Sequence, residues 1–291
     1  MLLQIAAIIA PLFVCAGIGF VWGRLGRPFD TQLVTGLALS FGMPCLILSS
    51  LTRFDISREA FISVGGAYAV ALAVSIAINA VVAKFLGLEI RAYTPVLAFS
   101  NSGNMGLPLC LFAFGEAGLT FAIVNLVVSS VISMTVSSAF FSGRTSFDIL
   151  YKNPIVYGVL AAIPFMVAGT RLPTWLSNTT ELIGGMAIPL MLIALGVAIS
   201  KLRMNFVTKS LGLSAFKLVL CFAIGVAVAE IAGLSGTARG TLILMFAMPV
   251  ALHNYVFAQR FERRAEEVAG MVLASTVLSF LTLPLLLWAV L

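Results

Sequence analysis

The sequence predicts an all-α integral membrane protein with ten membrane-spanning helices, arranged as two inverted repeats of five. Three observations predict this fold class: the composition, the spacing of the apolar runs, and a correspondence between the two halves. Of the 291 residues, 61% are hydrophobic and only 10% are charged. A soluble domain has roughly 25% charged residues, so a chain this apolar is expected to lie in a bilayer.

The apolar runs are about 20 residues long, the length that a helix needs to cross the hydrocarbon layer. The first run lacks a positively charged leader and ends at Arg24, so we expect a retained span and not a signal peptide. The connections are short, and no inserted soluble domain is expected. In chain order the expected spans are 3–23, 31–51, 60–83, 94–114, 117–141, 153–170, 174–199, 210–232, 239–259 and 268–290.

Lys and Arg are distributed unevenly between the loops. Loops after odd-numbered spans hold twelve of them, and loops after even-numbered spans hold four: Arg53, Arg58, Arg171 and Arg239. By the positive-inside rule, the odd loops are cytoplasmic and both termini lie outside the cytoplasm. The same flanking positions account for the net charge of +6. No basic run interleaved with aromatic residues indicates a nucleic-acid partner.

The two halves of the chain carry matching landmarks at nearly constant offsets, between 141 and 146 residues. The sequence therefore predicts two repeats, 1–145 and 146–291. Five spans per repeat is an odd number, so the second repeat must enter the membrane from the opposite side, as in many secondary transporters. The matching pairs are Pro11 and Pro154, Pro44 and Pro189, Pro108 and Pro249, and the segments SSVIS (129–133) and STVLS (275–279).

Spans four and nine are each interrupted by helix-breaking residues. In NSGNMGLPL (101–109), Pro108 removes a backbone donor, and Gly103 and Gly106 tolerate non-helical dihedrals. We expect one half-helix to end near Ser100 and another to begin near Pro108. The counterpart is AMPVALHNY (247–255), with Pro249 as the breaker.

Paired breaks of this kind indicate a transport site, because freed backbone groups survive in a membrane only beside protein or a water-filled cavity. Helix N-termini that meet at such a break favour an anion. The alternative is that Pro108 and Pro249 only kink two helices, with no chemistry attached.

Polar residues beside the breaks are the candidate ligands. Asn101, Ser102 and Asn104 could contact a substrate or cap the half-helices. His253, the single histidine, could couple transport to protons or act as a neutral hydrogen-bonding residue. Asn254 is favoured over His253 for substrate contact.

Other polar residues within the expected spans could have either a structural or a functional role. Lys217 could reach the cytoplasmic surface or take part in transport. Glu181 and Glu230 lie near span ends and are expected at the interface. Small hydroxyl residues could line a cavity or allow close helix packing: Ser129, Ser130, Ser133, Ser275, Thr276 and Ser279. The four cysteines lack metal-binding spacing, so no metal and no cofactor is predicted.

The sequence resembles the auxin efflux carrier family of plants and bacteria over nearly its whole length. The blocks that carry the resemblance are NSGNMGLPL (101–109), NPIVYG (153–158), IPLMLIALG (188–196), MPVALHNYVFA (248–258) and STVLSFLTLPLLL (275–287).

The resemblance implies a fold similar to that of bile-acid symporters and the sodium–proton antiporter NhaA. Spans 1, 2, 6 and 7 would form a scaffold, and spans 3–5 and 8–10 a mobile transport unit in which spans 4 and 9 cross. Members carry small carboxylates by an elevator-type motion, often as homodimers through the scaffold. Asn125 looks like the substrate-facing position of span five. For a bacterial member, the implied location is the inner membrane.

These observations favour a secondary carrier of a small organic anion. A sodium- or proton-coupled symporter or antiporter of the same fold remains the alternative, although neither break contains an Asp or Glu. An intramembrane enzyme is disfavoured because one histidine and few intramembrane acids supply little acid–base machinery. A channel or receptor is the third alternative, and saturation of flux would distinguish a carrier from a channel.

Overall fold

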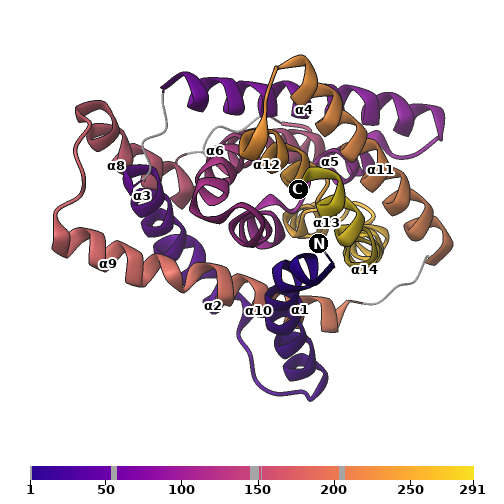
Figure 1. Cartoon of the computed structure of the whole chain (residues 1–291). Coiled ribbons are helices and arrows are strands. Elements are labelled where there is room, and N and C mark those ends of the chain that lie inside the picture. Colours follow the sequence, from indigo (N-terminus) through magenta and orange to yellow (C-terminus); the bar gives the residue numbers. More distant parts are fainter. Residues whose placement is uncertain (1, 54–57, 145–150, 152, 203–206) are drawn as a thin grey trace.

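A computed structural model describes residues 2–53, 58–144, 151, 153–202 and 207–291 (Figure 1). Over these residues the chain is helical, with turns and short extended segments between helices. The first half contains α1 (Leu2–Arg24), α2 (Thr31–Leu37), η1 (Ala38–Gly42), α3 (Met43–Arg53), α4 (Arg58–Phe85), α5 (Ile90–Ala98), η2 (Ser102–Gly106) and α6 (Leu107–Ser142). The second half contains α8 (Pro154–Ala168), α9 (Thr174–Gly185), α10 (Ala187–Lys201), α11 (Val207–Ile231), α12 (Gly236–Phe246), α13 (Leu252–Arg260) and α14 (Ala265–Val290).

The all-α membrane class is confirmed. Among the described residues, seven helical segments are long and apolar enough to cross a membrane. All ten expected ranges contain helix, but length alone does not identify each of them as a span. The range 153–170 holds the shorter helix α8, the range 239–259 is broken, and one 41-residue segment, Ser102–Ser142, covers two expected spans.

The long segment Ser102–Ser142 folds back on itself at Gly115. This residue has φ 66° and ψ −156°, a backbone conformation that is essentially restricted to glycine. Ser102 and Ser129, which lie almost equally far from Gly115 along the chain, are joined by a hydrogen bond of 3.3 Å. Gly115 is therefore the tip of a helical hairpin, in agreement with the expected division between residues 114 and 117.

Helix ends follow from local capping residues. Asp30 Oδ1 accepts hydrogen bonds from the backbone N–H groups of Gln32 and Leu33, both at 3.0 Å, and so begins α2. Asn153 caps α8 in the same way, and Pro154 occupies the first turn of that helix, where its missing N–H costs nothing. Asp30 and Asn153 thus mark the starts of α2 and α8.

One group of helices packs through glycines. Helix α1 lies along α10, and a Cβ built on Gly196 would stand only 2.0 Å from the carbonyl oxygen of Ala16. Helix α3 packs on α8 and α9, with Gly158 and Gly184 against its backbone. Small residues allow membrane helices to approach this closely. The group consists of α1, α2, η1, α3, α8, α9 and α10.

The second group comprises α4, α5, η2, α6 and α11–α14. Helix α11 packs on α14, α12 packs on α6, and α4 packs on both α5 and α6. In Figure 1 these helices gather on one side of the molecule, with α12 and α13 near its centre. The two groups meet where α1 contacts α6 and α14, and where α10 contacts η2.

Candidate functional site

Two broken helices meet near the centre of the second group. Helix α5 ends at Ala98 and α12 ends at Phe246, and each is followed by a short non-helical segment. The two segments pair as an antiparallel bridge between Ser100 and Val250. The backbone N–H of Asn101 donates to the carbonyl of Pro249 at 2.8 Å, and that of Ala251 donates to Phe99 at 3.2 Å. Each break therefore satisfies backbone groups of the other, as a membrane interior requires.

The breaking residues act differently from one another. Pro249 lies inside the non-helical segment, where it has no N–H to leave unpaired. Pro108 lies in the first turn of α6, so it starts a helix and does not kink one. Gly103 and Gly106 lie within the π-helical turn η2 and do not use the wider dihedral range of glycine. Gly106 instead allows close packing, since a Cβ there would stand 2.4 Å from the sulfur of Met245 unless that side chain moved.

Buried side chains satisfy the free carbonyls at the C-terminal end of α12. Ser100 Oγ donates to the carbonyl of Phe246 at 2.6 Å. The Lys217 ammonium donates to Ser100 Oγ at 2.7 Å and to the carbonyl of Met248. Lys217 is fully buried. The expectation that it reaches the cytoplasmic surface is wrong, because the free carbonyls at the break offer its charge hydrogen-bond partners inside the protein.

The N-terminal ends of η2 and α13 face a cavity of about 260 Å³. Asn101 Oδ1 caps η2 by accepting from the N–H of Asn104 at 3.3 Å, whereas no side chain caps α13. The breaks contribute Ser100–Asn104 and Ala251–His253 to its lining. No Asp, Glu, Lys or Arg lines the cavity in the described part of the chain.

Among the described residues, two buried polar atoms of the cavity lining have no hydrogen-bond partner: Asn101 Nδ2 and His253 Nε2. An unpaired buried polar group costs about 1–3 kcal/mol. A ligand oxygen that reached Asn101 Nδ2 would remove this cost at that donor. Ser102 and Asn104 also line the cavity.

Asn125 and Asn254 do not line this cavity. Asn254 is fully buried and occupied, since it accepts from Ser137 at 3.1 Å and donates to the carbonyl of Pro95 at 3.2 Å. In this arrangement His253 lines the cavity and Asn254 does not. Asn125 is also fully buried, and neither of its amide atoms has a partner among the described residues.

Some of the small hydroxyl residues line the cavity, and others take part in helix packing. Ser129, Ser130 and Ser133 of α6 line the cavity. On α14, Ser275 Oγ accepts from the N–H of Val250 at 3.0 Å, and Thr276 bonds within its own helix. Ser275 thus holds the second break in place, and of these six hydroxyl residues only the three on α6 line the cavity.

The opposite wall comes from the first group of helices, and no motif in the sequence identified it. Its residues are Thr35, Leu39, Met43, Ile155 and Met191. Side chains this apolar give no chemical signal, so only the packing of the two helix groups brings them to the site.

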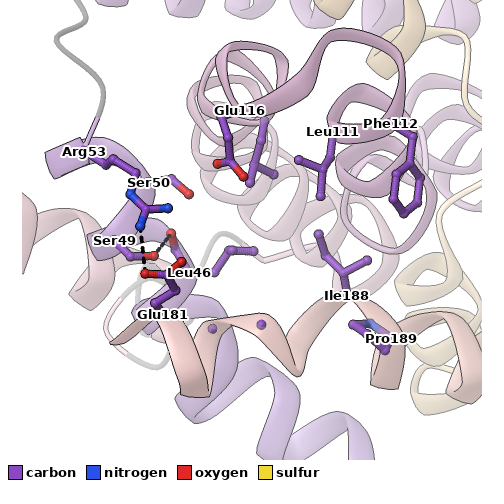
Figure 2. Close-up of a pocket in the computed structure, with 13 residues that line it drawn as sticks. Leu46, Ser49, Ser50, Arg53, Leu111, Phe112, Glu116, Glu181, Ile188 and Pro189 are labelled. Atoms are coloured by element: carbon purple, nitrogen blue, oxygen red, sulfur yellow. Dashed lines mark hydrogen bonds and ion pairs between the residues drawn. The ribbon is translucent and has the colours of Figure 1, made fainter. Parts of the chain in front are cut away.

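A second cavity, of about 290 Å³, lies near the hairpin tip (Figure 2). It is lined by Leu46, Ser49 and Arg53 of α3, and by Glu116 just after Gly115. Arg53 forms an ion pair with Glu181 of α9 at 2.7 Å, and both side chains are about half exposed. Glu181 therefore lies at an exposed edge, and so does Glu230, which pairs with Arg239 at 2.8 Å.

A family model for membrane transport proteins matches residues 5–150 and 149–287. The chain belongs to this family of membrane transport proteins, and membership in the auxin efflux carrier family is confirmed. The chain is 25% identical over 281 residues to an uncharacterized transporter of Methanothermobacter thermautotrophicus, covering 93% of this chain and 91% of that protein. It is 24% identical over 207 residues to an uncharacterized transporter of Methanocaldococcus jannaschii, with 67% of each chain covered. The protein is a multi-pass membrane transporter.

Proposed function

We propose that the protein is a secondary carrier of a small organic carboxylate, bound at the cavity beside the two helix breaks. The observation that carries this proposal is the meeting of two helix N-termini at a cavity without acidic lining residues. Exposed N–H groups and the positive ends of the helix dipoles favour an anion there. The unpaired Asn101 Nδ2 supplies a further donor.

The size of the cavity supports a small substrate. Sites for drug-sized ligands have volumes of about 300–1,000 Å³, and this cavity has about 260 Å³. A carboxylate of a few carbon atoms suits this volume, with its charged end at the helix N-termini and its body against Leu39 and Met191.

We further propose that the chain crosses the membrane ten times as two inverted repeats, 1–145 and 146–291. The breaks after α5 and α12 occupy corresponding positions of the halves, and each expected span range contains helix. The Lys and Arg distribution supports cytoplasmic odd-numbered loops and outward-facing termini in an inner (plasma) membrane.

An elevator-type motion fits the arrangement of the two cavities. Both lie against the continuous segment Thr31–Arg53, one near Thr35 and the other near Ser50. Fifteen residues of helix span about 22 Å at about 1.5 Å per residue. In the proposed motion, α1–α3 and α8–α10 form the scaffold, the other helices carry the substrate along it, and a homodimer would form through the scaffold.

The test is uptake of a panel of radiolabelled small carboxylates by proteoliposomes. We expect saturable uptake of at least one acid by the wild type and an affinity at least 10-fold lower for Asn104→Ala. Asn178→Ala, on the exposed face of α9, is the matched control and should transport as the wild type does. Absence of saturable uptake of any acid, by wild-type protein that is folded, would overturn the proposal.

A further inference from the structure

The Lys217 ammonium is separated from the cavity by a single hydroxyl group. It donates to Ser100 Oγ at 2.7 Å, and Ser100 lines the cavity. The proton of Ser100 Oγ is directed to the carbonyl of Phe246, so this oxygen is free to accept from Lys217. The positive charge therefore lies directly behind the residues that would receive a substrate.

The surroundings of Lys217 suit a cation but do not neutralise it. Its partners are a hydroxyl and the carbonyl of Met248, close to the C-terminal end of α12. Such an end carries about half a negative charge. No described acidic residue forms an ion pair with Lys217. A buried ammonium without a counter-ion is costly, so an anion bound in the cavity would stabilise the charged form of Lys217.

The same atoms are those that a bound inorganic cation would require. Carbonyl and hydroxyl oxygens beside a helix C-terminus are typical ligands of a coupling ion in broken-helix transporters. In this chain the ammonium of Lys217 takes these oxygens for itself.

We infer that Lys217 is the fixed positive counter-charge of the binding site. Its single charge matches the site to a monoanionic carboxylate, and its ammonium group takes the place of a coupling cation. This inference rests on the proposed carrier function. It has a consequence for charge movement, because Lys217 belongs to the helix group that would move. With a monocarboxylate bound, the ammonium and the carboxylate cancel, whereas the empty site carries one positive charge.

The membrane potential should then affect the movement of the empty site back across the membrane. It should not affect the movement of the site with substrate bound, which is called the loaded step here. Exchange of labelled for unlabelled monocarboxylate uses loaded steps alone, so its rate should change less than about 2-fold between 0 and −100 mV. Net efflux requires the empty return and should accelerate several-fold, within the limit of about 50-fold that one full charge permits. Both rates should be unchanged when sodium is replaced by N-methylglucamine.

The experiment uses proteoliposomes whose potential is clamped with valinomycin and potassium, and a monocarboxylate that the panel has identified. Lys217→Met, which keeps an unbranched side chain one atom shorter and without the charge, should lower the affinity at least 10-fold. Lys84→Met, at the exposed end of α4, is the matched control. The wild-type voltage measurements remain decisive if Lys217→Met does not fold.

Three outcomes would overturn the inference: exchange as sensitive to potential as net efflux, a requirement for sodium, or wild-type affinity in folded Lys217→Met. In each of these cases carboxylate transport itself persists, so the proposed function would stand. Failure of the proposed function has a different signature, namely that no carboxylate is transported at all.

Discussion

Asn101 and Asn254, at the two helix breaks, have the same side chain but different hydrogen-bond partners. Asn101 caps η2 and retains an unpaired amide nitrogen at the cavity, whereas both ends of the Asn254 side chain are occupied by Ser137 and Pro95. The first residue is suited to bind a ligand. Asn254 ties α13 to α5 and α6. A substitution of Asn101 should therefore affect substrate binding, and a substitution of Asn254 should affect stability.

Asn254→Ala should lower the free energy of unfolding by about 1–3 kcal/mol, because it leaves the buried carbonyl of Pro95 without its donor. Asn101→Ala removes an unpaired nitrogen together with one cap, and should weaken substrate affinity more than it lowers stability. Thermal unfolding in detergent and uptake kinetics measure the two effects. Equal loss of stability in both variants would contradict this division.

The sequence analysis singled out the polar residues at the breaks, but it could not predict which way their side chains point. His253 and Asn254 are neighbours on one helix, and their side chains point about 100° apart. Which one faces the cavity depends on the residue at which α13 begins, and that is set by the pairing of Val250 with Ser100 across 150 residues. The direction of the Lys217 side chain likewise depends on the position of Ser100, to which it donates a hydrogen bond.

At the scale of elements, the hairpin tip at Gly115 determines where α6 reverses. Gly115→Ala places a Cβ on a backbone with φ 66° and ψ −156°, which should cost about 1–3 kcal/mol of stability. Gly66→Ala is the matched control, since that glycine is exposed in α4 with open space around its Cβ position. Thermal unfolding of both variants tests this, and equal melting temperatures would show that the turn tolerates a side chain.

The helices themselves were the most predictable elements. Runs of about 20 apolar residues and capping residues such as Asp30 and Asn153 are local signals, and helix is present in all the expected ranges. The division of spans two and seven into shorter helices at η1 and Met186 was not predicted. Pro44 and Pro189 are the local signal that was missed, because each lacks the N–H that would bond to the carbonyl four residues earlier.

At the scale of the whole molecule, a charged cluster joins the ends of four segments in the group that would move. Glu267 pairs with Lys209 at 2.5 Å and with Arg264 at 3.1 Å, and it accepts a hydrogen bond from Tyr93. Glu89 joins the cluster through Arg264 at 3.4 Å, and it also pairs with Arg263 at 2.5 Å. The cluster connects the start of α5, α11 and α14 to the loop after α13, and so favours movement as one body.

Glu267→Gln should lower the free energy of unfolding by about 1–3 kcal/mol, since it removes a carboxylate whose side chain is only 10% exposed from between two cations. Lys209 is 43% exposed, and solvent screening keeps the cost below that of a fully buried pair. Glu230→Gln is the matched control: its side chain is 62% exposed, and the cost should be below about 1 kcal/mol. Similar costs in both variants would argue against a bracing role for the cluster.

The pairing of the two breaks also constrains how the protein is made. Until residues 247–251 have been synthesised and inserted, the N–H of Asn101 and the carbonyl of Phe99 have none of the backbone partners that they hold in the finished fold. Residues 1–145 therefore enter the bilayer with their central backbone unpaired, a state that lipid penalises. The proposed binding site would be completed only when residues 247–251 leave the ribosome, so a truncated first half should be a substrate for membrane quality control and not a half-working carrier.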